Sequence, residues 1–271
     1  MSSQTARRII KIGFRLVAVL LVLLLGAVVF DLYYPRTTHL REFDSDEIAR
    51  LETAMWRSYY EKQQVRLFNQ LAELLRTQYH MPLVRSNQVA YYGANAAFVF
   101  KQGRERKDYE KALPDLMKFY GEIRKLSDVS FNVDRVARLE LEWWIIHRQR
   151  AQHKPADLQQ ALAELQAEIY QVPLERVMEH GRLRAEAMTI RDTRAEAGGV
   201  SEADWAAINE LLKQSWQSLA KAVRSDIAGN ADVSSAQRAQ RASSLEFFAV
   251  TLRASRSMRT RRPRSQQPDR P

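Results

Sequence analysis

The sequence predicts an all-α protein, with a single N-terminal transmembrane helix followed by an antiparallel multi-helix bundle or a short helical-hairpin array. Three observations predict this class. One apolar run, residues 16–30, contains no charged residue and no proline. The chain has only nine glycines and eight prolines in 271 residues, and it is rich in residues that favour helices. Finally, no stretch shows the sustained alternation of apolar and polar residues that is typical of strands.

The apolar run becomes long enough to cross a membrane when its flanks are counted. By itself it is shorter than the span of about 20 residues, but apolar residues precede it, and Tyr33 and Tyr34 follow it as an interfacial aromatic belt. We therefore expect a transmembrane anchor at residues 16–34. Basic residues without any acid precede the anchor. The positive-inside rule then places residues 1–15 in the cytoplasm and the bulk of the chain in the periplasm or outside the cell.

A cleaved signal peptide would share the basic start and the apolar run. The best cleavage position follows Ala27, but Leu25 stands where a small residue is required. We therefore expect the segment to be retained. The Arg7-Arg8 pair resembles part of a twin-arginine signal, although Lys11 interrupts the pattern. The acid-free start also matches one property of mitochondrial presequences.

The net charge of +10 is confined to the two ends of the chain. Residues 1–15 contribute +4 and residues 253–271 contribute +6, so residues 16–252 are neutral. Nucleic acid is not an expected partner, because a domain that binds it needs a basic face. The chain has no cysteine, which excludes disulfides and thiolate metal sites. In an exported domain this absence fits a bacterial source.

Composition divides the rest of the chain into three segments. Residues 35–43 form a polar connector. Residues 44–257 show the apolar periodicity of helices, so we expect one all-α extracytoplasmic domain there. Residues 258–271 are rich in arginine, proline and glutamine, and this composition predicts a disordered tail.

Eight helices are expected in the domain. The first opens at Asp44, whose spacing to Glu47 resembles a capping box, and runs to Tyr79, either unbroken or with a break near residues 61–64. The second begins with Ser86 as its cap and ends near residue 101. The other six are expected at residues 109–126, 133–150, 157–171, 173–198, 201–229 and 234–257. Pro114 either kinks the third helix or starts a new one.

The stretch KQGRERKDYEKALPDLMKFY, residues 101–120, has a glycine turn, then Asp108-Tyr109, Ala112-Leu113 and a further helical segment. This pattern resembles the hairpin turn of a tetratricopeptide repeat, and the resemblance implies that two helices pack as a hairpin. It covers one hairpin only, since no second copy follows at the ~34-residue period of that family.

The most unusual helical segment is residues 138–150. Glu140, Trp144 and His147 are spaced i, i+4 and i+7, so they share one face of a helix. A carboxylate, an indole and an imidazole along one stripe can line a pocket for a small ligand. This face is therefore a candidate binding site.

Two aromatic residues of the first helix, Trp56 and Tyr60, would complete such a pocket if they faced this stripe. The alternative interpretation is a buried aromatic ridge, in which basic neighbours such as Arg138 and Arg148 satisfy the carboxylate and the imidazole. The sequence leaves both interpretations open.

No metal site or cofactor is expected. A ferritin-like di-metal bundle needs pairs of Glu and His three positions apart, whereas Glu142 and His147, like Glu175 and His180, are five apart. The HExxH, P-loop, GxGxxG and GxSxG motifs are absent. No catalytic residue is therefore assigned.

The arginine-rich tail has two interpretations. It is either a solvated chain end or a site for an anionic partner, such as a lipid headgroup, an acidic envelope polymer or an acidic protein surface. The residues concerned are Arg259, Arg261, Arg262 and Arg264.

From these features we expect a membrane-anchored helical scaffold or accessory subunit that engages a protein partner at the membrane surface. Helical hairpins, surface aromatic candidates and the lack of a catalytic motif favour this function. The alternative is a small-ligand binder or enzyme with its pocket around Glu140, Trp144 and His147. A third hypothesis is an anchored envelope-binding protein that uses the tail.

Overall fold

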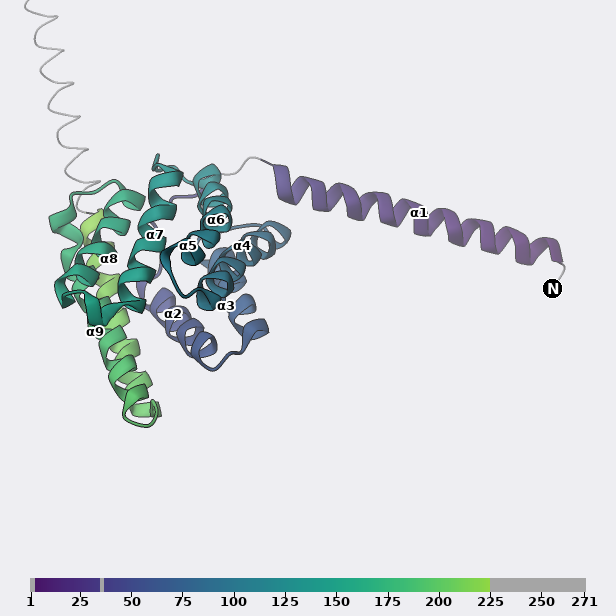
Figure 1. Cartoon of the computed structure of the whole chain (residues 1–271). Helices are drawn as coiled ribbons and strands as arrows, with labels where there is room; N and C mark the ends of the chain where they lie inside the picture. The colour runs from purple at the N-terminus through teal and green to yellow at the C-terminus, as the bar shows by residue number, and fades with distance from the viewer. Residues whose placement is uncertain (1–2, 35–36, 225–271) are drawn as a thin grey trace, which may run out of the picture. The chain divides into compact units, whose positions relative to one another are not determined.

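The computed structural model describes residues 3–34 and 37–224, with side chains from residue 11 onward. Its described part is helical and contains no strand, which confirms the predicted class (Figure 1). We call residues 37–224 the body. The helices are α1 (Ser3–Tyr33), α2 (Ser45–Tyr60), α3 (Gln64–Thr77), α4 (Leu83–Gln102), α5 (Arg106–Tyr109), the 3₁₀ helix η1 (Glu110–Ala112), α6 (Leu113–Leu126), α7 (Val133–Arg148), the 3₁₀ helix η2 (Arg150–Gln152), α8 (Pro155–Tyr170), α9 (Leu174–Glu196) and a last helix at residues 202–224.

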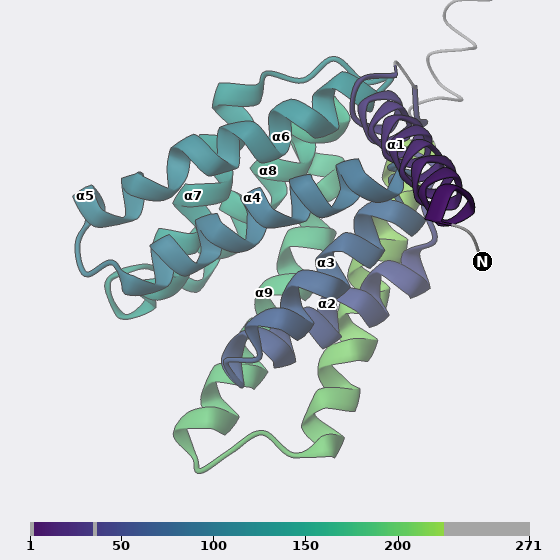
Figure 2. The same ribbon diagram turned by 90° about the vertical axis from the view of Figure 1, so that its right-hand side faces the viewer.

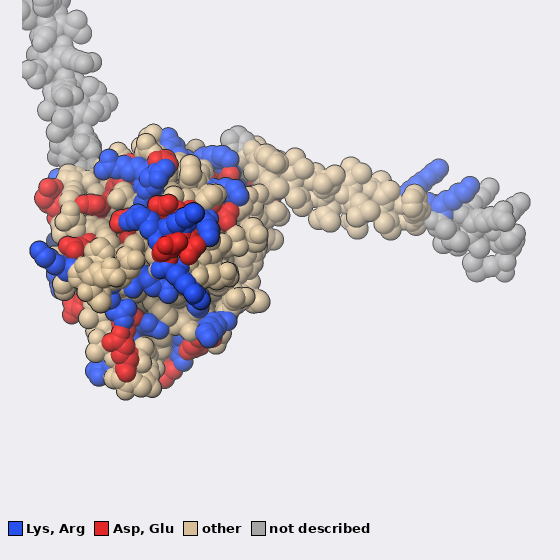
Figure 3. Space-filling model, viewed as in Figure 1, with Lys and Arg blue, Asp and Glu red and all other residues tan. Residues whose placement is uncertain are grey.

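The N-terminal helix α1 contains the predicted anchor. The stretch Lys11–Tyr33 of α1 has 23 residues and a mean hydropathy of 2.7, and its most apolar part is not buried. At ~1.5 Å per residue this stretch is about 35 Å long, which exceeds the ~30 Å hydrocarbon core of a bilayer. Most of its surface is uncharged, whereas acidic and basic side chains intermingle on the face of the body shown in Figure 3. One helix is thus long and apolar enough to span a membrane.

The first expected helix of the body is divided in two. α2 ends at Tyr60 and α3 begins at Gln64, and between them Lys62 adopts a φ of 61°. A left-handed residue interrupts the helical backbone, so the break that the sequence allowed near residues 61–64 is present and the unbroken helix is not.

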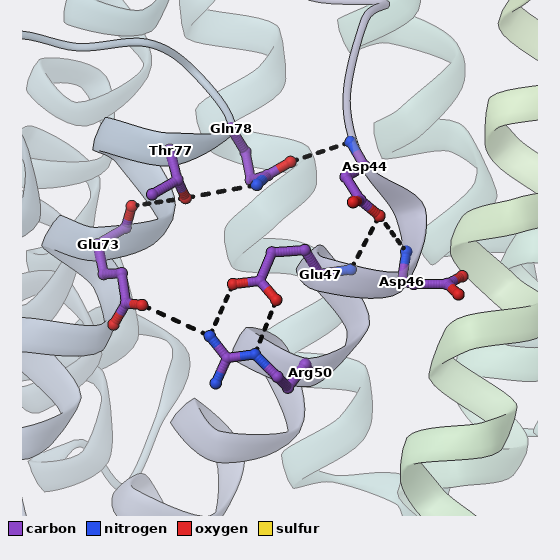
Figure 4. A network of polar contacts seen from close by, with 7 residues as sticks. All are labelled: Asp44, Asp46, Glu47, Arg50, Glu73, Thr77 and Gln78. Carbon is purple, nitrogen blue, oxygen red and sulfur yellow. Dashed lines mark hydrogen bonds and ion pairs between the residues drawn. The ribbon is translucent and has the colours of Figure 1, made fainter.

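The start of α2 is tied to the end of α3 (Figure 4). Asp44 caps α2, as predicted: its carboxylate accepts two free backbone N–H groups of the first turn. Its own N–H donates to the Gln78 side chain at 3.0 Å. Glu47 does not close the predicted capping box. It binds Arg50 instead, and Arg50 also lies 3.4 Å from Glu73 of α3.

α4 begins earlier than the sequence predicts. It starts at Leu83, and Ser86 lies inside its first turn, where its hydroxyl donates to the Leu83 carbonyl at 2.9 Å. The N-cap residue is Pro82, which has no capping side chain. The carboxylate of Asp31 accepts the N–H of Val84 at 2.6 Å and so takes over the cap. The predicted cap was wrong because this acceptor comes from a distant part of the sequence.

The turn after α4 accounts for the tetratricopeptide-like pattern. A Cβ on Gly103 would lie 2.6 Å from a ring atom of Tyr109, so glycine lets this ring lie against the turn. The Tyr109 ring also stacks on Phe100, with 4.8 Å between centroids. Pro114 occupies the first turn of α6, so a new helix starts there rather than a kinked one. α4 and α6 then pack together as a hairpin.

The second half of the body follows the predicted helix starts closely. Asn132 caps α7 by accepting a backbone N–H at 3.0 Å. α9 ends before the glycine pair at residues 198–199, both of which have positive φ. Ser201 and Asp204 exchange hydrogen bonds as a capping box at the start of helix 202–224. The box at Ser201 and Asp204 forms, whereas the one predicted from Asp44 and Glu47 does not.

Helices that follow one another in the chain pack side by side, from α2 through α9 (Figures 1 and 2). The last described helix then returns to the first helix of the body. Thr53 of α2 donates to Asn209 at 3.0 Å, and Arg57 forms an ion pair with Glu202. The body is therefore an antiparallel helical array whose two ends meet.

α8 and α9 approach each other closely at Gly181. A Cβ on Gly181 would overlap the backbone carbonyl oxygen of Gln159, which cannot rotate away. The adjacent His180 is fully buried, and its Nδ1 lies 3.1 Å from the Ser215 carbonyl oxygen. Burial, together with the Arg184 guanidinium, lowers the pKa of His180 to about 3. This histidine is thus a neutral packing residue at pH 7.

Replacing Gly181 by alanine should destabilise the body by about 1–3 kcal/mol, because the added methyl group overpacks the α8–α9 contact. The matched control is Gly121→Ala in α6, where a Cβ would meet nothing within 4 Å. That change should stabilise the helix by about 0.4–1 kcal/mol. Thermal unfolding followed by circular dichroism measures both. Equal melting temperatures for the two variants would contradict the packing described.

Candidate functional site

A cavity of about 310 Å³ lies inside the body, lined by side chains from α2, α3, α4, α6, α7, α9 and helix 202–224. Ten of its lining residues are aromatic and seven are leucine, isoleucine or methionine. We call it the aromatic pocket. The five residues singled out in the sequence all line it: Trp56, Tyr60, Glu140, Trp144 and His147.

The α2 wall of the pocket is built from aromatic rings. Trp56 and Tyr60 are four positions apart and face the same side of the helix. Tyr60 contacts Tyr59 edge to face, with 5.2 Å between centroids, and the guanidinium of Arg191 stacks on its ring. Burial raises the pKa of Tyr60 to about 12, so the phenol is neutral at pH 7. At Trp56 and Tyr60 this wall therefore offers rings and no negative charge.

Glu140 of α7 is the polar group at the centre of the opposite wall. Its carboxylate accepts the Tyr120 hydroxyl at 2.7 Å and the Trp144 indole N–H at 2.9 Å. Arg138, the partner expected for a buried ridge, does not reach it and pairs with Asp134 at 2.9 Å instead. Glu140 is thus held by neutral donors that are themselves part of the pocket wall.

Burial is the largest influence on Glu140 and raises the pKa of its carboxyl group above 4.5. The positive charge of Arg184 and the hydrogen bonds from Tyr120 and Trp144 oppose this shift. The indole N–H of Trp143 also favours the ionised form of Glu140, although it is not placed to donate a hydrogen bond to the carboxylate. The Trp143 nitrogen is buried without a partner. The pocket wall therefore contains an unused hydrogen-bond donor beside a poorly solvated carboxylate.

His147 lies one turn beyond Trp144 and is held by Asp192 of α9, with 2.9 Å between Nε2 and the carboxylate oxygen. Burial would raise the pKa of Asp192, but His147 and neighbouring arginines, including Arg191, hold it below its usual value. Arg148, the other expected arginine, donates to the main-chain carbonyl of Lys101 at 3.0 Å. The imidazole is therefore fixed by an acid on another helix.

A buried ion pair that the sequence analysis missed closes the pocket. Arg184 of α9 lies 2.5 Å from Glu52 of α2, and the Trp216 indole N–H donates to the same carboxylate at 2.6 Å. We call these three residues the buried hub. One signal could have revealed it: Glu52 interrupts the apolar stripe of α2, four positions after Ile48 and three before Met55. A charge inside an apolar stripe needs a buried partner.

A second cavity of about 530 Å³ lies between α7, α8 and α9. His147 and Asp192 line it, and His147 also lines the aromatic pocket. Most of its acidic side chains are already paired, as Glu186 is with Arg182 at 2.9 Å and Asp192 is with His147 at 2.9 Å.

Comparisons with protein families, with curated proteins and with solved structures found no match to this chain. Among the residues that the structure describes, no group of three or more histidine, aspartate or glutamate side chains is placed to hold a metal ion. The arguments about function therefore rest on the geometry of the aromatic pocket.

Two expectations lie outside the described residues. One is the helix at residues 234–257, and the other is the arginine tail with its expected anion-binding group. That group comprises Arg259, Arg261, Arg262 and Arg264.

Glu140→Gln should change how the stability of the body depends on pH. Because the pKa of Glu140 is raised by folding, the contribution of this group to stability is fully present below about 4.5 and is lost as the pH rises through the folded pKa. The free energy of unfolding of the Gln variant should therefore increase relative to wild type as the pH rises above 4.5.

Urea unfolding at a series of pH values measures this difference. Glu142→Gln is the matched control, since it makes the same change on the same helix at a residue that pairs with Arg106 outside the pocket. A difference between Glu140→Gln and wild type that stays constant or shrinks with rising pH would show that burial does not raise this pKa.

Proposed function

We propose that the chain is a membrane-anchored binding protein for a small, largely apolar ligand, which occupies the aromatic pocket. The observation that carries this proposal is the convergence of α2 and α7. Trp56 and Tyr60 from one helix, and Glu140, Trp144 and His147 from the other, line the same cavity. This function is the second of those that the sequence suggested.

The properties of the cavity match those of ligand sites. Such sites have volumes of ~300–1,000 Å³, are lined mainly by apolar and aromatic side chains, and contain a few convergent polar groups. The aromatic pocket has about 310 Å³ and ten aromatic lining residues. A closely packed aromatic ridge would leave few voids larger than a water molecule. The volume therefore favours the pocket over the ridge.

Binding is better supported than catalysis. Glu52 pairs with Arg184, and His147 pairs with Asp192. Glu140 accepts hydrogen bonds from two groups that are neutral at pH 7. A nucleophile activated by an adjacent base would be the signature of covalent chemistry, and none of these pairs contains one. These polar side chains instead hold the side chains of the pocket wall in place.

The scaffold function stays a prediction that rests on the sequence. Outside α1, the large apolar side chains that are well exposed in the described body are scattered over three helices: Val65, Leu83, Tyr91 and Met117. Single exposed apolar residues are ordinary on protein surfaces, so they favour no protein partner. Binding of an anionic lipid or envelope polymer by the tail likewise stays a prediction.

We also propose that α1 crosses the membrane once, with residues 1–15 on the cytoplasmic side and the body in the periplasm or outside the cell. The positive-inside rule supports this orientation, because the four basic residues at the start of the chain come without an acid. A ligand would then reach the pocket from the extracytoplasmic side.

The orientation can be tested by cysteine labelling, because the chain has no cysteine of its own. A membrane-impermeant maleimide should label Ser130→Cys, an exposed position between α6 and α7, in cells whose cytoplasmic membrane is intact. Ser3→Cys should react only after the membrane is disrupted. The cysteine-free wild type is the blank, and labelling of the Ser3 variant alone in intact cells would reverse the orientation.

Filling the pocket should abolish ligand binding. Ala97 of α4 lines the cavity, and Ala97→Phe adds a phenyl group to it. Two probes of equal shape suit the test: benzyldimethyl(2-hydroxyethyl)ammonium and its neutral carbon isostere, 3,3-dimethyl-4-phenylbutan-1-ol. Wild-type protein in detergent should bind at least one of them, measured by tryptophan fluorescence. The filled variant should bind at least tenfold more weakly.

The matched control is Ala207→Phe, which makes the same change at an exposed position of helix 202–224 and should bind like wild type. Melting temperatures report whether each variant remains folded. If neither probe binds wild type more tightly than the filled variant, the pocket is not a ligand site and the proposed function is wrong.

A further inference from the structure

We propose that the ligand of the aromatic pocket is an organic cation, a small ammonium compound whose charge lies against Glu140 and whose apolar groups lie against the rings. This inference rests on the proposed ligand-binding function and names the class of its ligand. It is argued from the charges of the lining residues, from their hydrogen bonds and from the aromatic walls.

The lining of the pocket has an excess of negative charge. The lining carries two carboxylates, Glu52 and Glu140, but one guanidinium, that of Arg184. Arg184 is committed to Glu52, with 2.9 Å between its Nε and the carboxylate oxygen. Its side chain is only 12% exposed, so this pair is shielded from water. Within the described residues, Glu140 receives hydrogen bonds from uncharged donors and no ion pair.

Burying the Glu140 carboxylate without a counter-charge is energetically unfavourable. A buried carboxylate is stabilised by hydrogen bonds, but a full counter-charge stabilises it more. The pKa of Glu140 remains raised. The two hydrogen bonds from Tyr120 and Trp144 therefore do not offset the effect of burial. A cation placed beside the carboxylate would supply the missing charge. The empty space next to Glu140 is thus electrostatically complementary to a positive ligand.

The aromatic rings that line the pocket also favour a cation. The faces of aromatic rings attract cations, most strongly where water is excluded, and quaternary ammonium ligands are recognised in this way. Two basic side chains of the protein already lie against rings that line this pocket. Arg184 lies 5.2 Å from the centre of the Trp143 ring, and Lys101 lies 4.6 Å from that of Tyr59. The same chemistry is available to a bound ammonium group.

An anionic ligand is the main alternative, since Lys101 and Arg148 lie near one end of the pocket. Their hydrogen bonds show another role. Lys101 donates to the carbonyl oxygen of Tyr59 at 3.2 Å, at the end of α2, and Arg148 donates to that of Lys101 at the end of α4. Basic side chains at helix C-termini offset the partial negative charge of the free carbonyls. These two cations are therefore accounted for by the fold.

The size of the cavity limits the ligand. Its volume of about 310 Å³ is at the lower end of the ~300–1,000 Å³ range of small-molecule sites. An ammonium group with one aromatic ring or a few short alkyl groups fits this space. A whole phospholipid does not, although the ammonium headgroup of one would.

The test compares the two isosteric probes, which differ only in the charge of the central atom. Wild-type protein should bind benzyldimethyl(2-hydroxyethyl)ammonium roughly tenfold to a hundredfold more tightly than 3,3-dimethyl-4-phenylbutan-1-ol, as expected for a desolvated cation against rings and a carboxylate. An anionic relative of the same shape, 3,3-dimethyl-4-phenylbutanoate, should bind more weakly than either. The comparison within wild type needs no variant to fold.

Glu140→Gln should remove most of the preference, bringing the ratio of the two dissociation constants to within about threefold of unity. The control Glu142→Gln should keep the wild-type ratio. If the neutral isostere binds as tightly as the cation, the pocket binds ligands but not by charge, and this inference alone is wrong. Tighter binding of the anion overturns it as well. Absence of binding by all three probes overturns the proposed function too.

A free compound and a lipid headgroup share this chemistry, and the membrane distinguishes them. The cationic probe can be titrated against full-length protein in nanodiscs of phosphatidylcholine or of phosphatidylglycerol. Because the anionic lipid also concentrates the cationic probe at its surface, the affinity of wild type is divided by that of Glu140→Gln in the same nanodisc. A smaller ratio in phosphatidylcholine identifies a headgroup as the competitor. An equal ratio in both identifies a free organic cation.

Discussion

The arrangement of the body depends on the buried hub, in which Glu52 of α2 meets Arg184 of α9 and Trp216 of helix 202–224. The ion pair has little access to water, with the two side chains 5% and 12% exposed. Removing one partner of such a pair leaves a buried charge and costs about 3–5 kcal/mol. The hub therefore holds the first helix of the body against the last two, and its three side chains line the aromatic pocket, which is partly open to solvent.

The hub also determines the electrostatic character of the pocket. Because Arg184 neutralises Glu52, it is not free to form an ion pair with Glu140 as well. Glu140 is left with the hydroxyl of Tyr120 and the indole of Trp144. Because the partners are divided in this way, the largely apolar cavity contains one carboxylate, that of Glu140, which forms no ion pair in the described body. The chemistry proposed for the ligand is thus a consequence of how the fold is closed.

Local patterns in the sequence predicted local structure well. Helical spacing placed Glu140, Trp144 and His147 on one face, and the helix expected from residue 133 begins there as α7. Interactions between distant segments were not predictable in this way. Arg184 and Glu52 are 132 positions apart, and the acid that caps α4 comes from the end of α1. Such pairs are set by tertiary packing, which a single sequence does not reveal.

The central claim is that the pocket holds a small cation when the protein is in its own membrane. Mass spectrometry of the small molecules released on denaturing the purified protein tests it most directly, with Ala97→Phe prepared in parallel. We predict an organic cation that is released in near-stoichiometric amount from wild type and is depleted from the filled variant. Release of the same compounds in equal amounts from both proteins would contradict the account.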